Sequence, residues 1–488
     1  MLGLCVTLFS SCLKGDQAPG GSDDGTGLFK INFIIDGKVH ESVESLGNEA
    51  ITAPAAPVKI GFAFEGWYTD NEYTQAFSSN SFLNTTLTEN VNIYAKYSKV
   101  NRAAQLNSVS YVGLITGEDS INKTLSSAGV GGTDLGVPLY NSQNDTMYIF
   151  FGDTFENGSI LEGNWRSNVC FTSTDKDLSD GIEFNGAIVN NKGVAKNIAH
   201  SFHRNFFEMT KIPTGAIEID GVMYMFYFSK YSWDNDPRDS MNYGGCVKSS
   251  DSGQTWERVY DLSWVNHTTD PADTNEGLSI PVLSILVNAD NSLNLNRGNI
   301  DIGTHFGYYF TQISPIDGKD GYIYILGEGG YRTEGIKLGR VLKENFENFE
   351  EYEYFNGYND AGEVIWLKGS EGCKTVCDNP EAFIINDICG EHSVMYNEYL
   401  GKWVVTYLST EGLVLRVSDN IWGNYGEEII VMAYWDVETI CPEGYRLTSI
   451  YGSFVHEKWT EGNGKTMYMV FSQYTPLYNS TLLKIEWE

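Results

Sequence analysis

Residues 249 to 256 read SSDSGQTW, which sets Ser, Asp, Gly, Thr and Trp at close spacing. A nucleophilic serine would need a base such as histidine within hydrogen-bond reach. The nearest histidine in sequence, His267, lies beyond the next expected strand. The spacing suits a hairpin turn better, because Asp251 can accept hydrogen bonds from backbone N–H groups, Gly253 can adopt a positive φ and Trp256 can pack beneath. We therefore interpret the stretch as a turn between two strands and not as a catalytic site.

Strands rich in aromatic residues recur along the chain, each after a turn. Each follows one short strand and precedes another, which is the pattern of β-propeller blades. The stretch LNSVSYVGLITGED near residue 106 can supply the outer strand of the last blade and so close the ring. We therefore predict an all-β protein whose residues 105–488 form a five-bladed β-propeller, and the spacing at 249–256 resembles the Asp-box of sialidase-like propellers. The five recurrences are NDTMYIFFGD at 144, DGVMYMFYFS at 220, DGYIYILGEG at 320, LGKWVVTYLS at 400 and GKTMYMVFSQ at 464.

The composition and charge exclude several classes of partner. The chain has 488 residues, of which 14% are aromatic, and its formal net charge is −32. Such a chain would repel the phosphates of nucleic acids and an anionic membrane surface. A neutral polysaccharide fits the charge better. We expect a monomer that binds such a polymer, without nucleic acid, cofactor or metal.

The chain begins MLGLCVTLFSSCLKGD. An apolar run that ends in small residues before a cysteine resembles a bacterial lipoprotein signal. This resemblance implies a signal over residues 1–11, a lipid on Cys12 and a polar, glycine-rich tether over residues 12–26. The alternative is that Cys12 is an ordinary cysteine in an uncleaved tail. We expect a lipid-anchored protein of the outer membrane, exposed at the cell surface or in the periplasm.

Residues 27–99 form a unit of their own, in which apolar and polar residues alternate as in half-buried strands. FKINFIIDGK opens the unit, GWYTD follows its middle turn and YAKY closes it. This order resembles the Listeria-Bacteroides repeat of surface proteins and implies a small β-rich module. Trp67 and Tyr68 could stack on sugar, but packing in the core is the better interpretation in so small a domain. We expect a spacer or weak adhesion module without chemistry of its own.

Three acidic residues stand at the mouths of expected propeller strands, where Asp is disfavoured by β-structure itself. Asp134 starts the first strand of blade one, Asp153 ends its neighbour, and Glu391 begins the first strand of blade four, across the ring. Each alone could be a turn or capping carboxylate. Carboxylates that face each other across a cleft are what glycoside hydrolysis requires, since one protonates the leaving oxygen while the other activates water or attacks the anomeric carbon. We predict that Asp134 and Glu391 form the catalytic pair and that Asp153 orients or tunes its neighbour.

Several motifs in order are similar to the domain-of-unknown-function 4185 group, which is glycoside hydrolase family 183: GGTDLGVPLYNSQNDTMYIFFGDTF, GYIYILGEGGYRTEGIKLGRV, and GEHSVMYNEYLGKWVVTYL followed by YGSF. The resemblance covers residues 105–488 and implies endo-acting hydrolysis of D-arabinan, the polymer of mycobacterial arabinogalactan and lipoarabinomannan. It also implies that Arg332 of GGYR and Tyr451 of YGSF contact substrate. Two alternatives stay open: a propeller hydrolase for L-arabinan or another furanoside, and a non-catalytic glycan-binding lipoprotein.

Further candidates surround these acids. Trp165 and Arg166 follow FFGDTF and could provide a sugar platform and a hydroxyl donor, or could belong to a plain surface loop. His203 is a candidate substrate contact, because the pair His200 and His203 without a third ligand is weak support for a metal. His305 in IGTHFGYYF is another candidate substrate contact. The late cysteines lack the paired spacing of a zinc ribbon, so we expect disulfides or buried thiols.

Overall fold

The computed structural model divides the chain into two compact units, Met1–Ser98 and Lys99–Glu488. The predicted signal, tether and lipidated Cys12, as well as His305, lie outside the described residues. No helix among the described residues is long and apolar enough to cross a membrane. The structure describes residues 28–205, 208–234, 240–266, 307–442, 450–475 and 477–488, and the backbone of 283–287 and 293–297.

The first unit is a four-stranded sheet in the order β2-β1-β4-β3. Strands β1 and β2 pair antiparallel, while β1 and β4 pair in parallel. Trp67 is buried in the core of this unit, where its ring lies 5.0 Å from that of Phe33 and its Nε1–H donates to the Pro54 carbonyl. Trp67 therefore packs in the core, as expected from the size of the module. The strands are β1 (Phe29–Ile35), β2 (Lys38–Ser45), β3 (Phe62–Tyr68) and β4 (Val91–Lys99).

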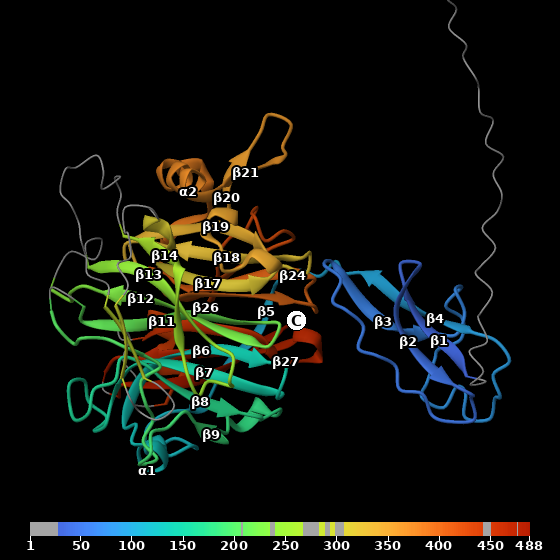
Figure 1. Ribbon diagram of the computed structural model, residues 1–488, viewed down its shortest axis with the longest axis horizontal. Helices are drawn as coiled ribbons and strands as arrows, with labels where there is room; N and C mark the ends of the chain where they lie inside the picture. Colours follow the sequence, from blue (N-terminus) through green and yellow to red (C-terminus); the bar gives the residue numbers. More distant parts are fainter. Residues whose placement is uncertain are drawn as a thin grey trace, which may run out of the picture. The chain divides into compact units, whose positions relative to one another are not determined.

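The described part of the second unit contains five sheets of four or more strands, each built mainly from consecutive strands (Figure 1). The first holds β6 (Gly132–Asn141), β7 (Thr146–Phe155), β8 (Val169–Ser173) and β9 (Gly186–Ala187), and the second β11 (Thr210–Ile219), β12 (Val222–Lys230), β13 (Met241–Ser249) and β14 (Glu257–Val265). The third holds β17 (Gln312–Asp317), β18 (Tyr322–Glu328), β19 (Glu334–Leu342), β20 (Glu353–Tyr358), β21 (Val364–Lys368) and β22 (Phe383–Cys389). The fourth holds β23 (His392–Asn397), β24 (Lys402–Leu408), β25 (Gly412–Ser418) and β26 (Ile429–Ala433), and the fifth β27 (Ile450–Glu461), β28 (Thr466–Gln473), β29 (Asn479–Trp487) and β5 (Leu106–Leu114).

Helices and one small sheet complete the second unit. The small sheet joins β10 (Ala199–His200), β15 (Leu283–Val287) and β16 (Leu293–Arg297). The α-helices are short: α1 (Thr124–Ala128), α2 (Gly369–Asp378) and α3 (Val437–Ile440). Strands therefore dominate the described residues, and the predicted all-β class is confirmed.

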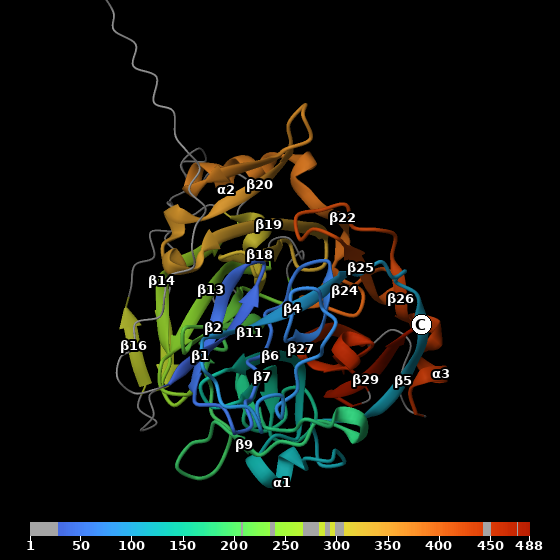
Figure 2. The same ribbon diagram turned by 90° about the vertical axis from the view of Figure 1, so that its right-hand side faces the viewer.

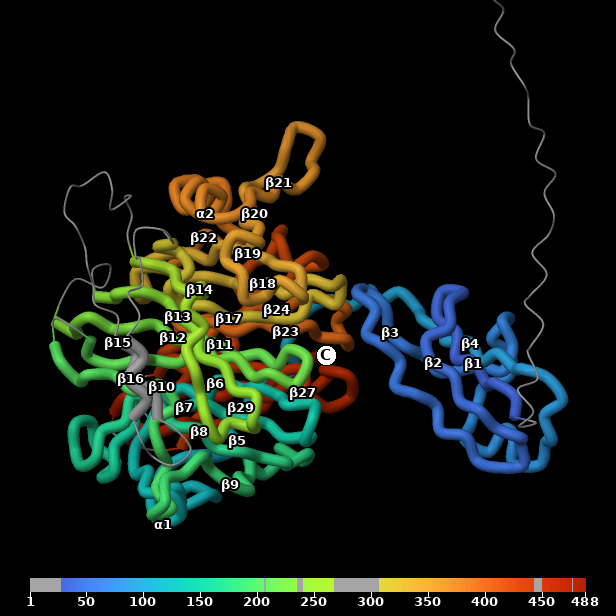
Figure 3. The backbone as a smooth tube through the Cα atoms, in the orientation of Figure 1, coloured from blue at the N-terminus to red at the C-terminus, as the bar shows by residue number. Residues whose placement is uncertain are grey.

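The first strands of the five large sheets meet in a cycle: β6 contacts β11, β11 contacts β17, β17 contacts β23, β23 contacts β27, and β27 returns to β6. Figure 3 shows β6, β11 and β17 next to one another. Strand β5 pairs antiparallel with β29, so segments from the two ends of this unit share one sheet (Figure 2). The arrangement is propeller-like, and LNSVSYVGL supplies the outer strand of the last sheet, as predicted.

Burial explains the composition of the strands in this cycle. The second strands of the sheets, such as MYIFF in β7, are covered on both faces by neighbouring sheets, so both alternating sets of side chains are apolar or aromatic. The described cysteines outside the N-terminal region are all free and buried. Of the two alternatives for the late cysteines, the structure therefore shows buried thiols.

The stretch SSDSGQTW connects β13 to β14 as a tight turn. The Asp251 carboxylate accepts hydrogen bonds from the Thr255 backbone N–H (2.9 Å) and hydroxyl (2.6 Å). Gly253 has φ 80°, and the buried Trp256 donates from Nε1 to the Gly253 carbonyl and packs edge-on against Phe150 of the first sheet. The interpretation as a structural turn is confirmed.

Candidate active site

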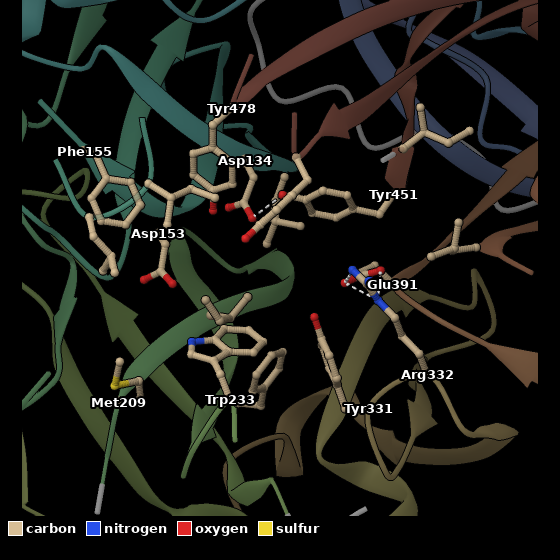
Figure 4. Close-up of a pocket in the computed structure, with 18 of the residues that line it drawn as sticks. Asp134, Asp153, Phe155, Met209, Trp233, Tyr331, Arg332, Glu391, Tyr451 and Tyr478 are labelled. Atoms are coloured by element: carbon tan, nitrogen blue, oxygen red, sulfur yellow. Dashed lines mark hydrogen bonds and ion pairs between the residues drawn. The ribbon is translucent and has the colours of Figure 1, made fainter. Parts of the chain in front are cut away.

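A cavity of about 500 Å³ opens where the first strands of the sheets begin (Figure 4). Segments from all five sheets contribute to its walls, which are mostly aromatic and aliphatic with a few charged groups. Such a cavity is typical of a small-molecule or sugar site. The lining residues are Asp134, Leu135, Asp153, Phe155, Ile160, Leu161, Trp165, Met209, Ile212, Phe228, Trp233, Tyr331, Arg332, Glu391, Leu408, Tyr434, Ile450, Tyr451, Tyr474 and Tyr478.

Asp134 stands near the start of β6 and is buried in the cavity wall. Its Oδ2 accepts a hydrogen bond from the Tyr451 hydroxyl at 2.8 Å. Burial raises the pKa of Asp134 to about 6, against the opposing effect of hydrogen bonds from Tyr478 and Tyr451. The negative charge of Glu391 raises the pKa of Asp134 a little further. At neutral pH Asp134 is therefore mainly ionised, but close enough to its pKa to accept a proton.

Gly152 lets the Asp134 carboxylate approach β7. A Cβ atom at position 152 would overlap with Oδ1 of Asp134. Gly152 is therefore required for the position of Asp134 rather than for the strand itself.

Gly152→Ala is expected to reduce kcat by about 10²-fold, because a shift of about 1 Å in a catalytic group can have an effect of that size. The melting temperature should change little, since the overlap involves the end of a side chain that can rotate away. Gly113→Ala in β5 is the matched control, because nothing lies within 4 Å of its added Cβ. Wild-type kcat in Gly152→Ala would contradict the role given to Gly152.

Asp153 ends the aromatic run of β7 and is 7% exposed. Its Oδ1 accepts two hydrogen bonds, from Trp165 Nε1–H at 2.8 Å and from the Thr210 hydroxyl at 2.5 Å. Burial raises the pKa of Asp153 to about 8; the Thr210 hydrogen bond opposes this rise, and the charge of Asp134 adds to it. At neutral pH Asp153 is therefore a neutral acid. Since both donors occupy Oδ1, the proton belongs on Oδ2.

Glu391 precedes β23 and forms an ion pair with Arg332. The Arg332 Nε lies 3.1 and 3.2 Å from the two carboxylate oxygens, and Nη2 lies 2.5 Å from Oε1. Glu391 raises the pKa of Arg332 above its ordinary value, although burial acts in the opposite direction. The guanidinium also lies over the rings of Tyr331 and Tyr451, at 4.9 and 5.0 Å from their centroids. The pair therefore presents a guanidinium held by its carboxylate partner to the cavity.

Glu328 supports this ion pair by accepting a hydrogen bond from the Arg332 backbone. It was not among the residues predicted from the sequence. The side chain is fully buried; its Oε1 accepts the Arg332 backbone N–H at 3.1 Å and its Oε2 accepts from the Gln312 amide. Burial raises the pKa of Glu328 well above its ordinary value. Tyr331 and Arg332 both have left-handed φ, 48° and 64°, so this turn needs such support. A signal was available: Glu328 ends YIYILGE as Asp153 ends MYIFFGD.

The remaining sequence-predicted residues fall in different places. Trp165 lines the cavity but gives its N–H to Asp153. Arg166 lies away from the cavity lining given above, and its guanidinium donates to the carbonyls of Ala195 and Gly129. His203 packs against the Trp165 ring, with 3.9 Å between centroids, and burial lowers its pKa to about 4. Within the described segments, no three His, Cys, Asp or Glu side chains gather in a way that could hold a metal.

The fold and site together define an all-β protein with a propeller-like cycle of sheets and an acid-lined aromatic cavity at its centre. Residues 119–484 match the family described as domain of unknown function 4185. The chain belongs to this family. Residues 29–96 match the Listeria-Bacteroides repeat domain. The resemblances to the domain-of-unknown-function 4185 group and to this repeat are therefore confirmed.

A relative from Evansella cellulosilytica, described as a membrane protein, is 30% identical over 159 residues. The match covers 29% of this chain and 22% of the relative, so the chain spans only a small part of the length of that protein.

Solved structures with a similar course of the chain include three that are described as hydrolases or glycosidases. One, from Bacteroides ovatus and described as a hydrolase, has a TM-score of 0.45 at 12% identity, covering 74% of this chain and 86% of that one. A β-xylosidase has a TM-score of 0.38 at 13% identity, with 78% and 95% covered. An exo-β-1,3-galactanase from Phanerochaete chrysosporium has a TM-score of 0.38 at 9% identity, with 77% and 64% covered.

Proposed function

We propose that the protein is a glycoside hydrolase. The observation that carries this proposal is the burial of two carboxyl groups, Asp134 and Asp153, in the wall of one cavity. Their different surroundings raise the pKa of Asp134 to about 6 and that of Asp153 to about 8. Two acids whose pKa values differ in this way can act as base and acid at the same pH, which is the requirement of glycoside hydrolysis. A lectin needs aromatic rings and hydrogen bonds, but it gains nothing from burying a neutral acid beside an ionised one.

In this proposal Asp153 protonates the leaving glycosidic oxygen from Oδ2, and Asp134 acts as base or nucleophile. Glu391 holds Arg332 toward the substrate, because both of its carboxylate oxygens are engaged by the guanidinium. The pair Asp134 and Glu391, which the sequence favours, is the second candidate. It would require substrate to separate Glu391 from Arg332.

We propose D-arabinan as the substrate and endo-acting cleavage as the reaction, with the five sheets as blades of a five-bladed propeller and the chain as a member of glycoside hydrolase family 183. The resemblance of the motifs around Asp134, Arg332 and Glu391 supports this choice. The charge of −32 and the aromatic cavity also favour a neutral polymer over a polyanion. L-arabinan or another furanoside is the alternative substrate, and glycan binding without catalysis is the alternative function.

The deciding experiment incubates the protein with mycobacterial arabinogalactan and, separately, with plant L-arabinan, and analyses the soluble products. Oligosaccharides of mixed length from arabinogalactan alone are the expected result. Products from L-arabinan alone would show that L-arabinan, and not D-arabinan, is the substrate. Binding of either polymer without products would replace hydrolysis by glycan recognition.

We propose a lipid anchor on Cys12 and a spacer or weak adhesion role for the N-terminal module. Cys12→Ser in the native host is therefore expected to move the protein from the membrane fraction to the soluble fraction. Cys170→Ser is the matched control, since this buried thiol lies in the second unit. Unchanged membrane association of Cys12→Ser would rule out the lipid anchor.

A further inference from the structure

Trp233 is an exposed aromatic side chain in the cavity wall. It follows β12, is 45% exposed and lines the cavity. Figure 4 shows its indole between Asp153 and Tyr331, on the side of the cavity opposite Asp134. An exposed indole in the wall of a cavity, next to charged and polar groups, can provide an apolar face for a bound ligand.

A buried lysine holds this indole. Lys230, the last residue of β12, is 1% exposed, and its Nζ donates to the Ser240 hydroxyl at 2.7 Å. The same Nζ lies 4.2 Å from the centroid of the Trp233 ring and 3.8 Å from that of Tyr331. The two rings also meet edge to face at 5.7 Å and 69°. Lys230, Trp233 and Tyr331 therefore fix one another by cation–π and aromatic contacts.

The position of Lys230 is costly for a purely structural residue. Burial and, to a lesser extent, the charge of Arg332 lower the pKa of Lys230 to about 7, although the charges of Glu391 and Glu328 act in the opposite direction. The ammonium form is therefore the main form below this pH. An apolar residue could fill the same volume without this penalty. What an ammonium group adds is a fixed orientation for two aromatic rings, because each ring turns its electron-rich face toward the cation.

We propose that Trp233 is a sugar-stacking platform at the edge of the cavity and that Lys230 is a positioning residue that holds its indole for the incoming glycan. This inference rests on the proposed glycoside hydrolase function and names a substrate-binding residue that the sequence motifs do not contain. An indole that is already fixed loses little conformational freedom when a sugar ring covers it. The platform binds the ground state and the transition state alike, so it acts on KM rather than on kcat.

At about pH 6, where Lys230 is mainly protonated, the test compares kcat and KM on the polymer that the wild-type protein hydrolyses for Trp233→Ala, Lys230→Met and Lys230→Arg. Trp233→Ala should raise KM at least about tenfold with a much smaller change in kcat. Lys230→Met should raise KM in the same direction and change the near-ultraviolet circular dichroism of the folded protein, whereas Lys230→Arg should stay close to wild type in both. Trp435→Ala is the matched control, because Trp435 is 60% exposed but lies outside the cavity lining.

Retention in gels that contain neutral polysaccharides provides a readout independent of hydrolysis. Wild-type protein and Trp435→Ala should be retarded by the polymer that is bound, and Trp233→Ala should not. If products never form but this difference in retention is observed, the hydrolase proposal fails and the platform stands. Wild-type KM and wild-type retention in Trp233→Ala would overturn the platform, and an unchanged KM in a folded Lys230→Met would overturn the role of Lys230.

Discussion

Asp134→Asn is expected to lower kcat on D-arabinan by about 10²- to 10⁴-fold, the usual contribution of a general base or acid. The amide keeps the size of the carboxyl group and can still accept the hydrogen bond from Tyr451, but it cannot accept a proton or attack carbon. Because burial already disfavours the charged form of Asp134, removal of the charge should not destabilise the fold. The measurement is the initial rate of release of reducing ends, together with the melting temperature.

Two comparisons make this result specific. Asp145→Asn on the surface of the same unit should leave kcat unchanged, since Asp145 forms an exposed ion pair with Lys176. In gels, Asp134→Asn should still be retained by the polymer, because the aromatic wall is intact. A turnover near that of wild type would remove Asp134 from the catalytic pair.

Asp153→Asn is expected to lower kcat for hydrolysis of the polymer to a similar extent, by about 10²- to 10⁴-fold. Hydrolysis of an aryl arabinoside with a strongly acidic phenol as leaving group should be much less affected, because such a leaving group departs without protonation. This difference between substrates is the signature of a general acid. Glu391→Gln is the comparison: if it shows the difference and Asp153→Asn does not, Glu391 donates the proton.

The pH dependence of kcat, measured at saturating polymer, tests the same assignment, because loss of the Lys230 charge above about pH 7 acts on KM and not on kcat. Asp134 acts when it is deprotonated, so activity should fall as the pH drops below about 6. Asp153 acts when it is protonated, so activity should fall as the pH rises above about 8. The residual activity of Asp153→Asn should lack the alkaline fall and keep the acidic one. Wild-type activity that stays constant from pH 8 to pH 10, measured on a stable protein, would exclude Asp153 as the acid.

Local sequence alone was sufficient for the turn at 249–256 and for the aromatic strands of the five large sheets, whereas β20, β21 and α2 were not predicted. SSDSGQTW forms its turn with its own hydrogen bonds, and the recurring aromatic runs become the second strands of successive sheets. The assignment of LNSVSYVGL to the last sheet also followed from sequence, because a cycle of sheets leaves one outer strand to be supplied from the other end of the unit. The turn and the aromatic strands depend on alternation and turn chemistry within about ten residues, which the sequence displays directly.

The sequence identified Asp134, Asp153 and Glu391 as candidates, but their proposed roles depended on the tertiary structure. A carboxyl pKa depends on how much water surrounds it and which charges lie near it, and these neighbours come from distant parts of the chain. Thr210 reaches Asp153 from another sheet, Arg332 takes hold of Glu391, and Lys230 with Tyr331 fixes Trp233 in the wall. No spacing in the sequence predicts these contacts, because they form only when separate sheets pack around one cavity.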